Sequence, residues 1–336
     1  MKTIFTINGY FNYGNRLQLF ALAKILRSFG GKVNVYRPFD FGRYLKELLK
    51  YSILLRRKYK KEYKLRKFTQ KNALMGTSRR KTEYSVVGSD QVWNPKWYSD
   101  QYYLFDVPND SKKISYAASV GAQHLTDAEK EIFRKALSGY DYISVREKAA
   151  KIILEPLTDK KIEVVLDPTL LLGADEYVKM EKKPENLDDS ERYILCYILG
   201  DREMVRSIMK YAEERRFKVI LFSDRKESDY GIEEFLYLIH HAELICTDSF
   251  HACVFSFIFD RPFVAFRRAG GEDYMYSRLE NLIETFHLKN REYDGKGISE
   301  KNLVADYAEG KRILEKERKR SIEWLKNALE TSGEQK

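Results

Sequence analysis

The chain has few cysteines, and they form no pattern. Its 336 residues contain three, Cys196, Cys246 and Cys253, which is an odd number without regular spacing. This usage excludes a disulfide framework and is typical of a reducing compartment. CxxC and HExxH motifs are also missing. Nothing therefore predicts a structural or protease-type zinc site, and we expect neither a metal ion nor a cofactor.

Long apolar runs are missing as well. No stretch reaches the roughly 18 consecutive apolar residues of a membrane-spanning helix. The first residues, MKTIFTI, lack the long apolar region and small-residue cleavage site of a signal peptide, and are typical of a buried first strand. We therefore expect a cytoplasmic protein, peripheral at the inner face of the membrane.

Positive charge is concentrated in one segment. The net charge is +10, and residues 43–81 alone contain fifteen lysines and arginines against two glutamates. Leucines and tyrosines recur there near helical spacing. A basic amphipathic helix fits an anionic membrane surface or another polyanion, but the same pattern fits a helix that packs its apolar stripe on its own domain. RNP1, C2H2 and KH motifs do not occur, so we predict membrane contact and no nucleic-acid partner.

Short apolar runs alternate with helical stretches along the chain. We expect strands at 4–7, 32–36, 84–87, 114–117, 142–145, 162–166, 193–199, 218–222, 243–245 and 262–266. A charged run with a proline, 181–192 (EKKPENLDDSER), is the predicted linker. The pattern predicts an α/β protein with two Rossmann-like lobes of mostly parallel strands and a cleft between them. The predicted lobes are 1–180 and 193–298, followed by a C-terminal helix in 299–336.

Polar residues follow several of these strands directly. Asp248, Ser249 and His251 come after one apolar run and open the next. Open α/β sheets bind ligands at the carboxyl ends of their strands, so these side chains are candidates for chemistry. The alternative is that Asp248 or Ser249 only caps a helix whose first turn buries His251. No GxGxxG or GxxxxGK[ST] loop accompanies them, so no nucleotide fingerprint is present.

Six polar blocks occur in a fixed order along the chain. They are 12–18 (NYGNRLQ), 86–94 (VVGSDQVWN), 115–121 (SYAASVG), 144–147 (SVRE), 166–169 (LDPT) and 247–251 (TDSFH). Together they resemble the signature blocks of the polysaccharide pyruvyl transferase family over about residues 5–285. Ala252 stands where that family usually has glycine. The segment 43–81 and the C-terminal helix lie outside the resemblance.

The resemblance implies a GT-B-like fold and transfer of pyruvate from phosphoenolpyruvate to a sugar as a cyclic ketal. The donor carries a phosphate and a carboxylate, for which arginine provides a planar fork of donors. His251 is the expected proton donor or phosphate ligand, and Asp90 the second catalytic residue. The expected donor-binding residues are Arg146, Ser249, Phe250, His251, Arg267 and Arg268. The expected acceptor-binding residues are Asn12, Asn15, Ser89, Asp90, Gln91 and Asn94.

Two other functions remain open at this point. A GT-B glycosyltransferase would bind a nucleotide sugar in the same cleft, because the fold alone does not select the donor. A non-catalytic saccharide-binding module, held to a membrane by 43–81, would retain binding without His251. In the preferred hypothesis the acceptor saccharide is lipid-linked.

Overall fold

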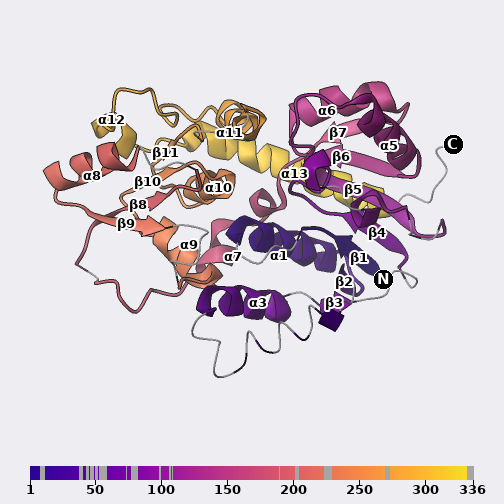
Figure 1. The fold of residues 1–336 in the computed structure, drawn as a ribbon, viewed down its shortest axis with the longest axis horizontal. Helices are drawn as coiled ribbons and strands as arrows, with labels where there is room; N and C mark the ends of the chain where they lie inside the picture. The colour runs from indigo at the N-terminus through magenta and orange to yellow at the C-terminus, as the bar shows by residue number, and fades with distance from the viewer. Residues whose placement is uncertain are drawn as a thin grey trace.

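Two parallel β-sheets form the framework of the protein (Figure 1). The first has seven strands in the order β3-β2-β1-β4-β5-β6-β7, and the second has four in the order β11-β10-β8-β9. The structure is a computed structural model. It describes residues 1–7, 12–37, 41–42, 45, 49, 52, 59–72, 74–76, 82–97, 100–105, 107, 109–188, 190–200, 204–222, 229–268 and 273–330.

The strand order reverses direction beside β1. The chain builds β1, β2 and β3 outward, then returns to place β4 on the other side of β1. Such a switch point opens a crevice at the carboxyl ends of the two central strands, where ligands of open α/β sheets bind. The first-sheet strands are β1 (Lys2–Phe5), β2 (Val33–Tyr36), β3 (Leu74–Gly76), β4 (Tyr84–Val87), β5 (Lys112–Ala118), β6 (Tyr142–Val145) and β7 (Ile162–Val164). Those of the second are β8 (Tyr193–Tyr197), β9 (Lys218–Phe222), β10 (Leu244–Thr247) and β11 (Phe263–Ala265).

Helices connect the strands, and their ends follow local sequence signals. In α5, the Thr126 side chain accepts from the Glu129 N–H while the Glu129 carboxylate accepts from the Thr126 N–H, a capping box. The first-lobe helices are α1 (Tyr13–Ser28), α3 (Lys60–Asn72), α4 (Asp100–Tyr103), α5 (Asp127–Ser138), α6 (Lys148–Leu154) and α7 (Ala174–Val178). Later in the chain come α8 (Val205–Glu214), α9 (Ile232–His240), α10 (Phe250–Ile258), α11 (Asp273–Thr285), α12 (Glu300–Leu303) and α13 (Ala308–Glu330). Three 3₁₀ turns are η1 (Pro95–Trp97), η2 (Glu155–Leu157) and η3 (Pro168–Leu171).

Helix α1 lies against both lobes. Its first residue, Tyr13, stacks on Phe235 of α9 with ring centroids 4.6 Å apart, and the Tyr13 hydroxyl donates to the Tyr230 carbonyl at 2.9 Å. Further along, Leu17, Ala21 and other α1 residues are buried in the same core as α9 and α10. The start of α1 is therefore fixed by the second lobe.

The basic segment divides into two kinds of surface. In α3 the apolar residues Leu65 and Phe68 are buried, and the Lys61 ammonium lies 4.4 Å from the Tyr13 ring centroid. This half of the segment packs its apolar stripe on its own protein. At 41–49, by contrast, Phe41, Leu45 and Leu49 are 64%, 44% and 67% exposed. The other residues of 43–58, 73 and 77–81, apart from Ser52, lie outside the described part of the chain.

The region 299–336, where one helix was expected, contains the short helix α12 and the long helix α13. Between α12 and α13, the buried guanidinium of Arg291 donates to the carbonyls of Asn302 (3.3 Å) and Val304 (2.8 Å). These carbonyls are held by a side chain, so α12 ends there, and α13 then returns to the first lobe. On that lobe, Ser321 accepts a hydrogen bond from the Leu166 N–H at 3.0 Å.

Candidate functional site

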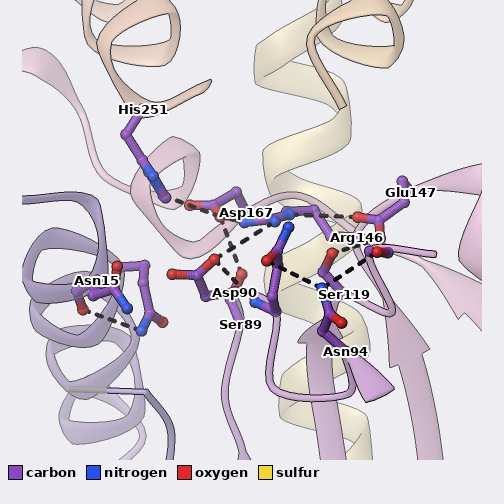
Figure 2. Close-up of polar contacts among 12 residues, drawn as sticks. Asn15, Ser89, Asp90, Asn94, Ser119, Arg146, Glu147, Asp167 and His251 are labelled. Atoms are coloured by element: carbon purple, nitrogen blue, oxygen red, sulfur yellow. Dashed lines mark hydrogen bonds and ion pairs between the residues drawn. The ribbon is translucent and has the colours of Figure 1, made fainter. Parts of the chain in front are cut away.

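Polar side chains from both lobes meet beyond the carboxyl ends of the first sheet (Figure 2). Asp90 follows β4, Arg146 follows β6 and Asp167 comes shortly after β7, while His251 enters from the first turn of α10. Parallel strands bring these positions to one edge, as expected for an open α/β sheet. All four residues are buried.

Arg146 is the centre of this cluster. Its Nη1 donates to Asp167 Oδ2 at 2.9 Å, its Nε lies 3.4 Å from Glu147 Oε2, and its Nη2 lies 3.9 Å from Asp90 Oδ1. Burial opposes its charge, but these three carboxylates more than offset burial, and the pKa of Arg146 is raised. Nη2 is buried without a hydrogen-bond partner. The fixed, charged guanidinium of Arg146 thus keeps one N–H donor group, at Nη2, that a ligand could bind.

Asp167 holds the other members in place. Its Oδ2 accepts from Ser89 Oγ (3.0 Å) and from Arg146, and its Oδ1 accepts from the Thr169 hydroxyl (2.6 Å). His251 Nε2 lies 3.6 Å from Oδ2, an ion-pair distance rather than a hydrogen bond. Burial raises the pKa of Asp167, but His251, Arg146 and Thr169 lower it by more, so it lies well below the ordinary value. Asp167 is therefore an anion that orients both Arg146 and His251.

The His251 imidazole lies directly against the backbone of α1. A Cβ atom added to Gly14 would come within 2.0 Å of His251 Nδ1 and 2.4 Å of its Cγ. Glycine is required here because of this close approach between the lobes. The ring thus lies between the Gly14 backbone and the Asp167 carboxylate. Its buried Nε2 has no hydrogen-bond partner.

Asp90 adopts an uncommon backbone conformation. Its φ is +76°, in the left-handed region that aspartate tolerates better than most non-glycine residues. The strained turn is fixed by a bridge to Ala118, in which the Ser119 N–H donates to the Asp90 carbonyl at 3.0 Å. Its Oδ1 accepts from the Gln91 N–H at 2.9 Å. Backbone strain of this kind is concentrated at functional sites, which supports a functional interpretation of Asp90.

The other predicted acceptor residues differ in how far their polar atoms are engaged. Asn12 caps α1 by accepting from the Asn15 N–H at 3.1 Å. Asn94 is buried, and its amide group contacts Gln91, the Gly121 carbonyl and the Lys96 N–H. Gln91 keeps a buried Nε2 without a partner. Gln91 thus retains a free donor, whereas Asn12 and Asn94 are engaged in local structure.

The second-lobe residues that were predicted to bind phosphoenolpyruvate also differ in where their side chains lie. Asp248 accepts from the Leu199 and Gly200 N–H groups at 2.7 and 2.8 Å and pairs with Arg268 Nε at 3.0 Å. Arg267 is 63% exposed at its side chain and pairs with Glu280 at 2.8 Å. Ser249 is the N-cap residue of α10, but its side chain makes no capping hydrogen bond. The structure therefore brings Arg268 to the strand ends and turns Arg267 to the surface.

A cavity of about 420 Å³ opens between the lobes next to this cluster. Arg146 and Asp167 line it from the first lobe, and Phe250 and Arg278 from α10 and α11. The Phe250 ring centroid lies 4.8 Å from the Arg146 guanidinium and 5.9 Å from that of Arg278. Arg278 Nε is buried without a hydrogen-bond partner. Burial and the nearby Arg146 lower the pKa of Arg278 to about 10.

From the sequence, no role was predicted for Gly14, Glu147 or Asp167. All three lie inside the recognised blocks, where their position was a usable signal. Arg278 follows the last predicted strand, like Arg267 and Arg268, and its charge alone made it a candidate for the same pocket; it lines the cavity. Trp93, although it lies in the block 86–94, is a core residue, packed edge-on against Phe133 and Tyr140.

Comparison with solved structures supports the class of fold. UDP-N-acetylglucosamine 2-epimerase from Rickettsia bellii is similar with a TM-score of 0.52 and 10% identity, covering 97% of this chain and 98% of that one. UDP-GlcNAc 2-epimerase from Methanocaldococcus jannaschii gives 0.48 and 16% identity, covering 94% and 98%. No curated protein matches the chain in sequence. The protein has a two-lobed, GT-B-like α/β fold, as predicted.

The sequence itself defines the family within this class. The family model described as polysaccharide pyruvyl transferase matches residues 12–270, which include all six polar blocks. The chain belongs to the polysaccharide pyruvyl transferase family, and the predicted recognition is confirmed. Among the helices that the structure describes, none is both long and apolar enough to cross a membrane.

Proposed function

We propose that the protein transfers the pyruvyl group of phosphoenolpyruvate to a saccharide and forms a cyclic ketal. The observation that carries this proposal is a pair of buried, unpartnered donors, Arg146 Nη2 and Arg278 Nε, on two residues that line the cavity between the lobes. His251 Nε2, also buried and without a hydrogen-bond partner, lies 3.6 Å from Asp167, another lining residue. Buried donors are nearly always satisfied, so open ones are candidates for binding a ligand.

The donor suits the two arginines. Phosphoenolpyruvate carries a phosphate and a carboxylate, and arginine binds each of these groups through parallel N–H donors. Arg146 is already surrounded by carboxylates, which fix its orientation and offset its charge. Arg278 makes no ion pair with any residue that the structure describes, so its charge is available to an anion. Arg268 contributes a third cation, held by Asp248.

The chemistry needs one proton donor and two proton acceptors. Protonation of the methylene carbon of the donor leaves a cation at the adjacent carbon, which the first sugar hydroxyl attacks with loss of its proton. Phosphate then leaves, and the second hydroxyl attacks the same carbon and loses its proton. One of the two released protons balances the methylene, and the other leaves with phosphate. We assign the first protonation to His251, oriented by Asp167.

Asp90 is our candidate for binding the acceptor hydroxyls and taking a proton from them. Its carboxylate lies on the first-lobe side of the cluster, 3.9 Å from Arg146 Nη2. Gln91 Nε2 is an open donor in the same turn. An acceptor at this turn would place its hydroxyls beside a donor molecule bound at Arg146.

The acceptor is lipid-linked in this proposal, and the protein is peripheral to the cytoplasmic face of a membrane. Phe41, Leu45 and Leu49 recur every four residues and are exposed, in a segment rich in lysine and arginine. Apolar groups that enter the interface, with cations that meet anionic headgroups, produce this kind of membrane binding. The apolar face of α3 is covered by the protein. We therefore assign the apolar membrane contact to the region of 41–49 and not to the whole of 43–81.

The membrane contact can be tested by vesicle sedimentation. Changing Phe41, Leu45 and Leu49 together to serine should weaken binding to phosphatidylglycerol vesicles at least about tenfold, because burying such side chains is worth about 1.5–3 kcal/mol each. The matched control changes Ile152, Met209 and Val304, which are equally exposed elsewhere, to serine. Equal binding by the two triple variants would sink the membrane proposal.

The catalytic proposal is tested by phosphate release from phosphoenolpyruvate with a panel of hexosides. Release should require an acceptor and give a product heavier by one pyruvyl ketal. His251→Ala and Arg278→Met should lose this activity, whereas Arg134→Met, at an exposed arginine of α5 paired with Glu131, should retain it. No release, together with thermal stabilisation by a nucleotide sugar and not by phosphoenolpyruvate, would favour a glycosyltransferase.

A further inference from the structure

A second polar cluster lies where the segment between the lobes meets the end of α9. It contains Glu181, which follows α7, together with His240 and His241, the last residue and the C-cap of α9. One ligand atom from each of the three residues lies within 4.8 Å of the other two. The site belongs to the opposite end of α10 from His251, because His240 stacks on Phe259, just after the last residue of that helix.

The spacing of these atoms is close to that of a coordination shell. Glu181 Oε1 lies 2.8 Å from His240 Nδ1, and Oε2 lies 3.4 Å from His241 Nε2. Ligands about 2.1 Å from a tetrahedral metal ion lie about 3.4 Å from one another. Small side-chain movements would therefore convert the present contacts into coordination by two imidazoles and one carboxylate.

Both rings and the carboxylate are held in position before any ion arrives. The His240 ring stacks on Phe259 at a centroid distance of 4.6 Å, and the His241 ring stacks on Tyr237 at 4.1 Å. The backbone around Glu181 is fixed by two hydrogen bonds: the Glu181 N–H donates to the Val178 carbonyl, and the Lys182 N–H donates to the Glu233 carbonyl. No lysine or arginine of the described chain lies within ion-pair distance of the Glu181 carboxylate, whose side chain is 8% exposed.

We propose that Glu181, His240 and His241 bind one divalent transition-metal ion, with Zn²⁺ the best match, and that the ion ties the inter-lobe segment to α9. Two imidazoles and a carboxylate are a ligand set that zinc accepts with a fourth position open to water. Among the residues that the structure describes, Arg261 places an unfavourable positive charge near all three ligands. Its guanidinium acts on the Glu181 carboxyl and on both imidazoles without a hydrogen bond to them, and its Nε is buried and unpartnered.

The site is tested with the full chain after treatment with EDTA, by calorimetric titration with Zn²⁺ and by thermal unfolding. Wild type should bind one equivalent and unfold at a higher temperature with Zn²⁺, while Mg²⁺ has no effect because it prefers oxygen ligands. The His240→Gln/His241→Gln double variant should lose both effects. His287→Gln is the matched control, because His287 also contacts a glutamate, Glu309 at 2.8 Å, but as a single exposed pair.

Arg261→Met provides a test in the opposite direction. Removing this cation should tighten Zn²⁺ binding by about tenfold or more, because a nearby positive charge opposes a divalent ion. If the His240→Gln/His241→Gln variant does not fold, Glu181→Gln takes its place, and it should likewise abolish binding of the one equivalent of Zn²⁺. Zn²⁺ binding that is unchanged in Glu181→Gln, or absent from wild type, would overturn the proposal. None of these measurements depends on the reaction at His251.

Discussion

The contact between Gly14 and His251 gives the sharpest test of how the site is held together. We predict that Gly14→Ala removes activity through His251, although it changes no group that takes part in the reaction. Ordinary van der Waals contact lies at 3.4–4 Å, whereas the new Cβ would lie 2.0 Å from Nδ1. The start of α1 is packed on the second lobe, so the imidazole has to rotate away from Asp167.

The magnitude follows from two separate effects. Forcing an extra carbon into a packed position destabilises a protein by about 1–3 kcal/mol. A misplaced proton donor lowers the rate by about 10²–10⁴-fold. Phosphate release with a saturating acceptor should therefore fall at least about 100-fold, while urea unfolding reports a loss of about 1–3 kcal/mol.

A double-mutant cycle isolates the steric cause. In the His251→Ala background the ring is gone, so adding Gly14→Ala should change the free energy of unfolding by less than about 0.5 kcal/mol. Gly139→Ala is the matched control, because Gly139 lies at the end of α5 and the nearest atom to its added Cβ is 3.4 Å away. If Gly14→Ala destabilised the wild type and the His251→Ala variant equally, the proposed contact would be refuted.

Three further predictions follow from buried charges. Asp167→Asn should lower the free energy of unfolding by about 3–5 kcal/mol at pH 7. The depressed pKa of Asp167 means that its stabilisation is complete above the unfolded value of about 3.9 and is lost only as pH falls on toward the much lower folded value. The difference between the two proteins in urea unfolding should therefore begin to narrow below about pH 4, and a constant gap from about pH 7 to about pH 3 would contradict the ion pair. Calorimetric binding of phosphoenolpyruvate should weaken as pH rises through about 10, the lowered pKa of Arg278, and Arg278→Met should remove that limb; binding that stays flat to pH 11 would exclude Arg278 as the ligand. Arg291→Met should destabilise the protein by about 2–4 kcal/mol in urea unfolding while the specific activity of the folded enzyme is kept, because it leaves the carbonyls between α12 and α13 unsatisfied; an unchanged midpoint would argue against that role.

Much of the framework could be predicted because its signals are local. The strands at 84–87, 142–145 and 218–222 have the expected bounds, and the other seven expected strands differ only at their ends, as β1 and β8 show. β3 was not predicted, because its three residues, Leu74–Gly76, lie in the basic segment and become a strand only by pairing with β2. The break before α13 depends on Arg291, which no local pattern connects to that turn.

The site was predictable in outline but not in detail. The blocks placed Asp90, Arg146 and His251 at strand ends, and parallel pairing then brings them to one edge. The role of Asp167 depends on β7 lying beside β6, a relation between strands that spacing does not reveal. Likewise, adjacent Arg267 and Arg268 look equivalent in the sequence, and only the fold turns one to Asp248 and the other to Glu280.

The return of α13 to the first lobe limits how the two lobes can move. The chain leaves the first lobe once through 181–192 and comes back through α13, where Arg318 and Arg320 donate to the carbonyls of Leu170 and Val164. A body attached at two points can rock about the line that joins them but cannot swing freely. The crevice between the lobes should consequently open and shut along one path, which would bring together or draw apart the two arginines beside Phe250.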